Sequence, residues 1–449
     1  MDTSRYRPLM AHLPDSATYV IVGAGVHGLS TAWHLAMELG SGDGIVLVDK
    51  AEPGAGATGI ACGCVRNFYM TEPLHAIVRE SVDVWNYDPV LFGFQQVGYI
   101  SCGEENQIGE YEKIQRSQNA VGYSSDLYVG QEARDFLSSI WPDFKHHTID
   151  VALHERLSGY AGTQQAVHGL AAMCERYGVT IVSGVEVTGY DVQGGSVRAV
   201  ETSAGTIAAE AVILSMGAWI AEHWRMLGKP MHLDVGYGDG SFVADKDMWT
   251  YWRLEEGEVY YDGPYYTADN RNPPVLHIEL MNTPVHDPRT GEELDDFTYV
   301  YWKNGTERME RPGIQGGCLP RRIGPEASVE PYGHANDEYQ APASFADYFT
   351  ATMGMFMERF EGIRPQFKER RNGGIGAFTP DNIPIMDWIL PNVYMVADSN
   401  HGFKMTGIGK LVAKELAGST HVPLLDPFRF DRFAKGTAYG SGTTHSPWV

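Results

Sequence analysis

The sequence is poor in positive charge: 34 lysines and arginines stand against 57 aspartates and glutamates, which gives a formal net charge of −23. Nucleic acids and anionic membrane surfaces recruit clusters of lysine and arginine, so this balance argues against both as partners. No apolar run reaches the roughly 18 residues that a membrane-spanning helix needs. The first eighteen residues also lack the apolar stretch of a secretory signal peptide. We therefore expect a cytoplasmic protein with no nucleic-acid or membrane partner.

Cysteine is also scarce, with five residues and no CxxC pair. Cys62 and Cys64 are too close in sequence for an easy structural disulfide, and no cysteine spacing matches a metal-ligand set. These features predict free thiols in a reducing compartment and no metal site. The chain is long, however: its 449 residues, 43% of them hydrophobic, are enough for a large core and for two or more domains.

The N-terminal part of the chain has the pattern of a strand, a helix and a second strand. The buried strand in "TYVIVGAG" is followed by a helix over "VHGLSTAWHLAMEL", with apolar residues at i, i+3, i+4 and i+7, and then by a buried strand in "GIVLVDK". This order predicts an α/β fold that begins with a Rossmann-type, parallel sheet. Residues 166–184 predict a further helix and strand, and residues 185–219 predict short strands joined by hairpins.

The glycines between the first strand and the first helix form a GxGxxG motif, Gly23, Gly25 and Gly28, with Val26 and His27 between them. In this motif the first glycine permits the tight turn, the second lets a diphosphate approach the backbone, and the third lets helix and strand pack closely. The N–H groups at the start of the helix then bind the diphosphate.

An acidic residue completes the motif. Asp49 ends the second strand, 26 residues after the first glycine, where an acid accepts hydrogen bonds from the adenosine ribose. Its neighbour Lys50 is either an adenosine contact or a surface charge. NAD and FAD share this pattern, so the motif predicts a dinucleotide site and leaves the cofactor open.

Three further blocks resemble one family of flavoenzymes. The segment "GAGATGIACGCVRNFY" (54–69) is similar to the second glycine-rich stretch of FAD-dependent D-amino-acid-oxidase-like amine oxidoreductases, which include sarcosine oxidase, glycine oxidase and dimethylglycine dehydrogenase. The segments "VEVTGYDVQ" and "AEAVILSMGAW" resemble the family's adenine-side strand and the turn that follows. The segments "GAFTPDNIPIMD" and "NVYMVADSNHGFKMTGIGKLVAKELAG" resemble its closing flavin-binding part.

The resemblance implies a FAD-binding domain from residues 1–90, 150–226 and 369–437, a substrate domain of mixed β-sheet and helix from 91–149 and 227–368, and a loose tail over 438–449. The dense aromatic residues and short strands of 227–368 suit an antiparallel sheet that carries a pocket. Beyond the glycine turn, the resemblance implies FAD contacts from Thr58, Val187, Gly217, Gly402, Phe403 and Lys404.

The resemblance also implies how FAD is held. Sarcosine oxidases attach it through a cysteine five residues before a Thr-Pro-Asp motif, and that position is Gly374 here. The dimethylglycine-dehydrogenase type uses a histidine in the second glycine-rich stretch, which has none in this chain. We therefore expect non-covalent FAD, with attachment to Cys62 or Cys64 as the alternative.

Four residues are candidates for the reactive site. In the turn "NHGFKMT", Lys404 matches the lysine that binds the substrate carboxylate in sarcosine-oxidase-like proteins, and Arg66 matches a basic residue near the flavin. A flavin contact or a surface charge is the alternative for both. His401 is a candidate base or a residue packed at the turn. Tyr261 is a candidate pocket aromatic or a core residue.

The implied reaction is hydride transfer from a carbon next to an amine to FAD, and then to oxygen or another acceptor. The implied substrate is a carboxylated amine such as an amino acid or N-methyl amino acid. Gln315 stands near the position of the lysine that assists oxygen in sarcosine oxidase, so an oxidase is only narrowly favoured over a dehydrogenase. The alternatives are oxidation of a C–OH group of a hydroxy acid, polyol or sugar, and a flavin-binding scaffold without activity.

Overall fold

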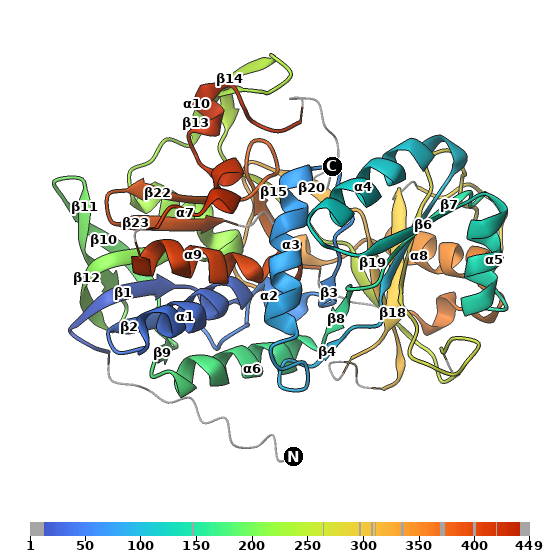
Figure 1. Cartoon of the computed structure of the whole chain (residues 1–449), viewed down its shortest axis with the longest axis horizontal. Helices are drawn as coiled ribbons and strands as arrows, with labels where there is room; N and C mark the ends of the chain where they lie inside the picture. Colours follow the sequence, from blue (N-terminus) through green and yellow to red (C-terminus); the bar gives the residue numbers. More distant parts are fainter. Residues whose placement is uncertain are drawn as a thin grey trace.

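The structure is a computed structural model that describes residues 13–145, 148–263, 265–295, 298–306, 309, 311–333, 336–368, 373–397, 401–418 and 420–440. Two large sheets lie at opposite ends of the molecule, with helix α3 (Glu72–Trp85) between them (Figure 1). The mixed α/β fold with mixed sheets agrees with the predicted fold class. Among the described residues, no helix has both the length and the apolarity that a bilayer-spanning segment requires.

The first sheet has eight strands and a parallel centre. Strand β1 pairs with β2 and β12 in parallel, β2 pairs in parallel with β9, and β12 pairs in parallel with β23. Antiparallel β10, β11 and β22 extend its edges. The strands are β1 (Ser16–Val22), β2 (Ile45–Asp49), β9 (Thr180–Ser183), β10 (Val187–Gln193), β11 (Ser196–Thr202), β12 (Gly205–Leu214), β22 (Ile385–Leu390) and β23 (Val393–Ala397).

The central strands of this sheet are buried on both faces, which explains their nearly continuous apolar sequences. Alternate residues of β1 and β2 enter two different cores: Ile21 and Leu47 pack with helices on one face, and Val20 and Val48 pack on the other. Helix α1 (Val26–Leu39), with the predicted bounds, lies on the first of these faces together with α6 (Thr163–Arg176) and α9 (Gly407–Gly418). Helix α7 (Ile220–Met226) contributes to the second core.

The second sheet has seven strands in the order β16-β19-β18-β17-β5-β7-β6. Its apolar face packs against α5 (Gln131–Ile140) and α8 (Ala343–Phe356). Helix α4 (Ile108–Ala120) packs against β6 and β7 at one edge of the sheet. The strands are β5 (Tyr99–Gly103), β6 (Ser125–Val129), β7 (Val151–Glu155), β16 (Glu256–Tyr260), β17 (Val275–Glu279), β18 (Tyr299–Asn304) and β19 (Gly313–Cys318).

Short elements join the two halves. Three small sheets contain β3 (Cys64–Val65), β4 (Phe94–Gln95) and β8 (Gly159–Ala161); β15 (Thr250–Arg253), β20 (Arg321–Gly324) and β21 (Ile375–Phe378); and β13 (His232–Gly236) with β14 (Phe242–Asp247). Two short α-helices, α2 (Ala57–Ile60) and α10 (Arg432–Lys435), also belong to the fold.

Two details differ from the division into domains that the sequence suggested. Strand β7 lies in the second sheet, although residues 150–226 were assigned to the first domain. The segment predicted as a loose tail begins with ordered contacts, because Ala438 bridges to Tyr237 and the Tyr439 N–H donates to Asp381 Oδ2 at 3.1 Å. Residues 441–449 lie outside the described residues.

Candidate active site

A cavity of about 450 Å³ lies between the two halves of the molecule. Its volume is within the range of ordinary ligand sites. Segments far apart in the sequence line it: the turn before α1, the end of β2, residues 54–66, the start of β10, the turn after β12, and residues 401–404. These segments contain nearly all of the predicted site residues, so the structure brings them to one place.

The glycine turn at the start of α1 is possible only with glycine at two positions. Gly23 has a φ of +100°, and a Cβ there would lie 2.3 Å from the Ser215 carbonyl oxygen. A Cβ on Gly28 would lie 1.8 Å from the Gly23 carbonyl oxygen, so Gly28 packs against the turn and does not line the cavity. Both glycines therefore hold the start of α1 close to β1 and β12.

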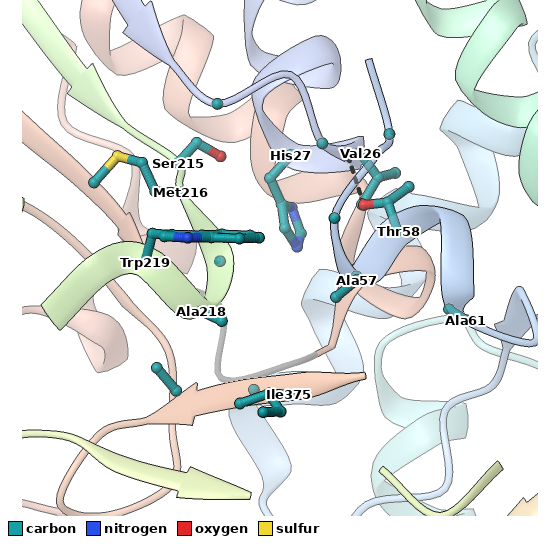
Figure 2. A pocket seen from close by; sticks show the side chains of 18 of the residues that line it. Val26, His27, Ala57, Thr58, Ala61, Ser215, Met216, Ala218, Trp219 and Ile375 are labelled. Carbon is teal, nitrogen blue, oxygen red and sulfur yellow. Dashed lines mark hydrogen bonds between the residues drawn. The ribbon is translucent and has the colours of Figure 1, made fainter. Parts of the chain in front are cut away.

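The first N–H groups of α1 lie at the cavity. The Val26 N–H donates to Thr58 Oγ1 at 3.1 Å, which links the glycine turn to α2. Figure 2 shows this bond as a dashed line. It also shows the His27 and Trp219 side chains, which point toward each other in the cavity. A helix start of this kind attracts anions because its N–H groups and its dipole point toward the ligand.

Asp49 connects the glycine turn to the end of β2. Its Oδ2 accepts a hydrogen bond from the Ala24 N–H at 2.7 Å, and its Oδ1 accepts one from the Ala51 N–H at 2.8 Å. Burial raises the pKa of this carboxyl, while the two N–H donors and Lys50 oppose that shift. Each carboxylate oxygen can accept a further bond, so Asp49 can also receive a ribose hydroxyl.

Part of the cavity is lined by a cluster that the sequence did not predict. The Lys50 ammonium pairs with Glu330 and lies 4.3 Å from the centre of the Trp219 ring. The Trp219 indole N–H donates to the same Glu330 carboxyl at 2.7 Å, and the Tyr332 ring lies 5.1 Å from Trp219. Lys50 is thus tied to its neighbours and is more than a solvated surface charge. Val187 and Gly217 line the cavity beside this cluster.

The opposite end of the cavity contains Arg66, His401 and Lys404, as predicted. The Arg66 guanidinium donates to the Phe68 carbonyl and lies 4.8 Å from the centre of the Tyr69 ring. The His401 ring also contacts Tyr69, with 5.4 Å between the two ring centres. Two cationic side chains, Arg66 and Lys404, therefore line the cavity, and the Phe68 carbonyl and the Tyr69 ring hold the Arg66 guanidinium in place.

The turn that carries Lys404 is held by two helices. The Trp85 indole N–H of α3 donates to the Phe403 carbonyl at 2.9 Å, and the Trp85 and Phe403 rings stack at 5.6 Å. The Ser30 hydroxyl of α1 donates to the Thr406 carbonyl at 2.8 Å. These bonds fix the backbone of the turn, which in turn limits the positions available to the Lys404 ammonium.

The sequence analysis also missed four cavity residues of the second sheet. They are polar or aromatic side chains on the second sheet and together line the cavity opposite Arg66 and Lys404: Tyr99, Glu256, Tyr299 and Tyr301. They lie on three strands that are distant in sequence. The alternation of polar and apolar residues in β18 was the available signal, but it did not show which face is turned to the cavity.

One predicted site residue was wrong in position. Tyr261 does not line the cavity; it follows the end of β16 and packs against Phe360, with 5.2 Å between the ring centres, at the apolar core of the second sheet. Gln315 also lies outside the cavity lining, and its Oε1 accepts a hydrogen bond from the buried Lys303 ammonium at 3.0 Å. Asn400 lies outside the described residues.

Comparison with known proteins identifies the family. Residues 18–272 match the DAO family, described as FAD dependent oxidoreductase. The match covers more than half of the chain, which therefore belongs to this family of FAD-dependent oxidoreductases, and its cofactor is FAD.

Individual relatives are more distant. Sarcosine oxidase subunit beta of Rhodobacter capsulatus is 26% identical over 195 residues, which are 42% of this chain and 46% of that protein. Glycine oxidase of Pseudomonas putida is 28% identical over 244 residues, or 47% of this chain and 58% of that protein. Dimethylglycine dehydrogenase of Rattus norvegicus is 26% identical over 218 residues, which are 48% of this chain and 25% of that protein. The matched part of this chain thus spans 46% of the length of the sarcosine oxidase subunit and 25% of the length of the dimethylglycine dehydrogenase.

Solved structures share the fold over nearly the whole chain. L-proline dehydrogenase from P. horikoshii has a TM-score of 0.73 at 19% identity and covers 95% of this chain and 100% of its own. Glycine oxidase from Geobacillus kaustophilus has a TM-score of 0.68 at 15% identity, and the likeness covers 93% of this chain and 99% of that one. These likenesses establish the α/β architecture of the family.

The residues of the cavity fit FAD. Gly25 at the start of α1, the Asp49 carboxyl and the Gly54 backbone all line the cavity, so it offers helix N–H groups for a diphosphate and a carboxylate acceptor for a ribose. The start of α1 would hold the diphosphate, Asp49 the ribose and Val187 the adenine, while residues 401–404 would face the flavin ring. The FAD ring supplies a hydride acceptor when it is bound.

We predict that Asp49→Ala weakens FAD binding by about 1–3 kcal/mol, because the ribose hydroxyls and two backbone N–H groups lose their acceptor. Titration of apoprotein with FAD, followed by flavin fluorescence, measures this loss as a higher dissociation constant. Asp49→Asn keeps one carbonyl acceptor and should lose less. An unchanged dissociation constant for Asp49→Ala would place the ribose elsewhere.

Proposed function

We propose that this chain oxidises a small amino acid or N-methyl amino acid at a carbon next to the nitrogen, with FAD as the hydride acceptor and oxygen as the final acceptor. The observation that carries this proposal is the pair of cations, Arg66 and Lys404, opposite a carboxyl and three tyrosines at one end of the cavity. The names of several relatives, sarcosine oxidase, glycine oxidase and L-proline dehydrogenase, denote oxidation of amino acids and support it.

The two cations suit a carboxylate. Lys404 would hold the substrate carboxylate, because a fixed charge in a cavity with little water binds an opposite charge more strongly than a solvated one does. Arg66 is held by the Phe68 carbonyl and the Tyr69 ring, so its position is fixed before a ligand arrives. Such preorganisation places the reacting carbon without further loss of freedom during the reaction.

The chemistry balances without a metal ion. The substrate carbon loses a hydride and the nitrogen loses a proton, which leaves an imine. Water then adds to the imine and releases a carbonyl compound together with ammonia or a primary amine. The tyrosines and apolar walls of the cavity limit the access of water while the hydride is transferred.

Product analysis tests this function. We expect each turnover to release one carbonyl product and one nitrogen product. An amino acid should give ammonia, and an N-methyl amino acid should give either methylamine or, where the methyl carbon is oxidised, formaldehyde with the demethylated amino acid. Turnover of a hydroxy acid of the same carbon skeleton should be slower by at least an order of magnitude. A faster reaction with the hydroxy acid, which yields a ketone and no nitrogen product, would replace the proposed donor with a C–OH group.

The final acceptor can be tested through Lys303. This ammonium is buried, donates to Gln315 Oε1 at 3.0 Å and lies 4.3 Å from the centre of the Tyr160 ring. Oxygen acquires negative charge as it is reduced, and a fixed cation nearby stabilises that charge. Lys303 does not itself line the cavity, but it acts electrostatically on the Cys64 thiol, which does. It would therefore supply, from the neighbouring strand, the charge that Gln315 lacks. The alternative cations are Arg66 and Lys404.

We predict that Lys303→Met slows reoxidation of the reduced enzyme by oxygen about 10- to 100-fold in stopped-flow mixing. The rate of flavin reduction by the substrate should stay within a factor of about three. The variant Gln315→Lys, which returns an ammonium to this place from the neighbouring strand, should restore fast reoxidation in the Lys303→Met background. Slow reoxidation of the unmodified enzyme would instead indicate a dehydrogenase.

A further inference from the structure

The face of the second sheet that lines the cavity is unusually polar. Along β16, β17 and β18, one set of alternate residues packs in the apolar core with α8, including Leu276, Ile278 and Trp302. The other set includes Glu256 and Tyr301, which line the cavity. Burying polar and charged groups costs free energy unless they have partners. A polar face that is turned inward therefore indicates contacts with a ligand.

Glu256 lacks a complete set of partners among the described residues. Its Oε1 accepts a hydrogen bond from the Tyr301 hydroxyl at 3.0 Å. Its Oε2 is buried and has no hydrogen-bond partner in the part of the chain that the structure describes. The residue is only 7% exposed and lines the cavity. A buried carboxyl oxygen without a donor is costly, and a donor from a bound ligand would remove that cost.

Among the described residues the buried Glu255 Oε2 likewise has no hydrogen-bond donor, so Glu256 differs from its two neighbouring glutamates in its lack of a cationic partner and in its place at the cavity. Glu255 accepts two hydrogen bonds from the Arg253 guanidinium, at 2.8 and 3.0 Å. Glu258 accepts from Gln315 Nε2 at 3.2 Å and lies 3.3 Å from the Lys368 ammonium. Neither of them lines the cavity. Of these three buried carboxyls, Glu256 alone faces the cavity, and no arginine or lysine forms an ion pair with it among the described residues.

The cations of the cavity and Glu256 act electrostatically on the same buried thiol. The Cys64 thiol lies within electrostatic range of Lys404, Arg66 and Glu256 at once. Burial raises the pKa of this thiol to about 11, Lys404 and Arg66 oppose the shift, and Glu256 adds to it. One end of the cavity therefore offers both positive and negative side chains, which is the charge pattern that complements a zwitterion.

We propose that Glu256 accepts a hydrogen bond from the substrate's amine, so that the enzyme selects amino acids with at least one hydrogen on the nitrogen. This inference rests on the proposed function. Lys404 binds the carboxylate end of the substrate, and Glu256, oriented by the Tyr301 hydroxyl, binds the N–H end. A substrate with a primary or secondary amine fills both sites. A neutral tertiary amine has no hydrogen to donate, and a quaternary ammonium never has one.

Binding of three unreactive carboxylates to the FAD-loaded protein tests the proposal. 2-Aminoisobutyrate carries an N–H donor but no hydrogen on the carbon next to the carboxylate, so it cannot be oxidised there. Pivalate has the same shape with a methyl group in place of the amine. Trimethylglycine has a positive charge without an N–H. Perturbation of the flavin absorbance gives a dissociation constant for each of them.

We expect the unmodified protein to bind 2-aminoisobutyrate at least tenfold more tightly than either of the other two carboxylates. Glu256→Gln should weaken binding of 2-aminoisobutyrate at least tenfold and change binding of pivalate less than twofold. Glu258→Gln removes a carboxyl from the same strand outside the cavity and should keep the original order. Should Glu256→Gln fail to retain FAD, Tyr301→Phe should weaken binding of 2-aminoisobutyrate and leave that of pivalate unchanged.

Two results would overturn the inference: an unchanged preference for 2-aminoisobutyrate in Glu256→Gln, or equally tight binding of trimethylglycine and 2-aminoisobutyrate by the unmodified protein. Failure of the proposed function has a different appearance. In that case no amino acid reduces the flavin, whatever the order of the three dissociation constants.

Discussion

Lys404→Met is expected to lower kcat/KM for a carboxylated amine by about 30-fold to several thousandfold, which corresponds to 2–5 kcal/mol for one partner of a buried charge pair. Methionine keeps most of the side-chain volume and removes only the charge. The turn itself is held by Trp85 and Ser30 through backbone carbonyls, so the fold and the FAD content should hardly change. Steady-state kinetics and the flavin-to-protein absorbance ratio measure both effects.

Lys410→Met provides a matched control. Lys410 lies six residues further along the chain, in α9, and its ammonium pairs with Glu80 at 2.6 Å without lining the cavity. Its replacement should leave kcat/KM within a factor of about two. The Lys404→Met loss should also be confined to substrates with a carboxylate. An equal loss for an amine without a carboxylate would mean that Lys404 serves the flavin or the fold.

Gly28→Ala is expected to abolish stable FAD binding. The new Cβ would lie 1.8 Å from the Gly23 carbonyl oxygen and 3.0 Å from its carbon, both of which are backbone atoms of the glycine turn. Either α1 moves away from the turn or the turn opens, at a cost of about 3 kcal/mol, the upper end of the usual penalty for overpacking. The N–H groups at the start of α1 then lose their alignment, and FAD affinity falls about 100-fold or more.

Purified Gly28→Ala should therefore be nearly colourless and should melt at a lower temperature than the unmodified protein. Gly109→Ala in α4 is the control, because a Cβ at Gly109 meets nothing within 4 Å and alanine favours the helix. This second variant should stay yellow and be at least as stable. A yellow Gly28→Ala protein with unchanged FAD affinity would show that the α1 start does not hold the diphosphate.

The parts of the fold that follow from local sequence could be predicted. Helix α1 begins and ends where the apolar periodicity indicated, and β10, β11 and β12 are the short strands joined by hairpins that residues 185–219 predicted, with their turns at Gly194 and Gly205. The glycine turn and Asp49 come together because β1 and β2 are adjacent parallel strands whose ends meet at one edge. These features depend on residues within one βαβ unit.

The second sheet could not be predicted in the same way, because strands distant in sequence form it. β5 pairs in parallel with β17, far along the chain, and this pairing brings Tyr99 to the His277 ring, which also contacts Tyr299, with 5.8 and 4.8 Å between the ring centres. The alternation in "YVYWKN" predicts two faces, but both faces are buried, so hydrophobicity did not distinguish the core from the cavity. Only the position of the FAD-binding half decides which face lines the site.

The prediction of Tyr261 illustrates the same limit at the level of one residue. In a strand the side chains alternate, so a shift of one position moves a residue to the opposite face. Glu256 faces the cavity, whereas Tyr261 is an odd number of residues further on and follows the end of β16. The aromatic composition of this segment was typical of a pocket, but the pocket residues are Glu256 and tyrosines from other strands.

Anaerobic mixing of the purified protein with matched donors tests the central claim most directly. The visible absorbance of the oxidised flavin is followed after addition of an amino acid or N-methyl amino acid and, separately, of the hydroxy acid with the same skeleton. The account predicts rapid bleaching with the amino acid and little or none with the hydroxy acid. Bleaching by the hydroxy acid alone, or by neither class of donor across a broad panel, would contradict it.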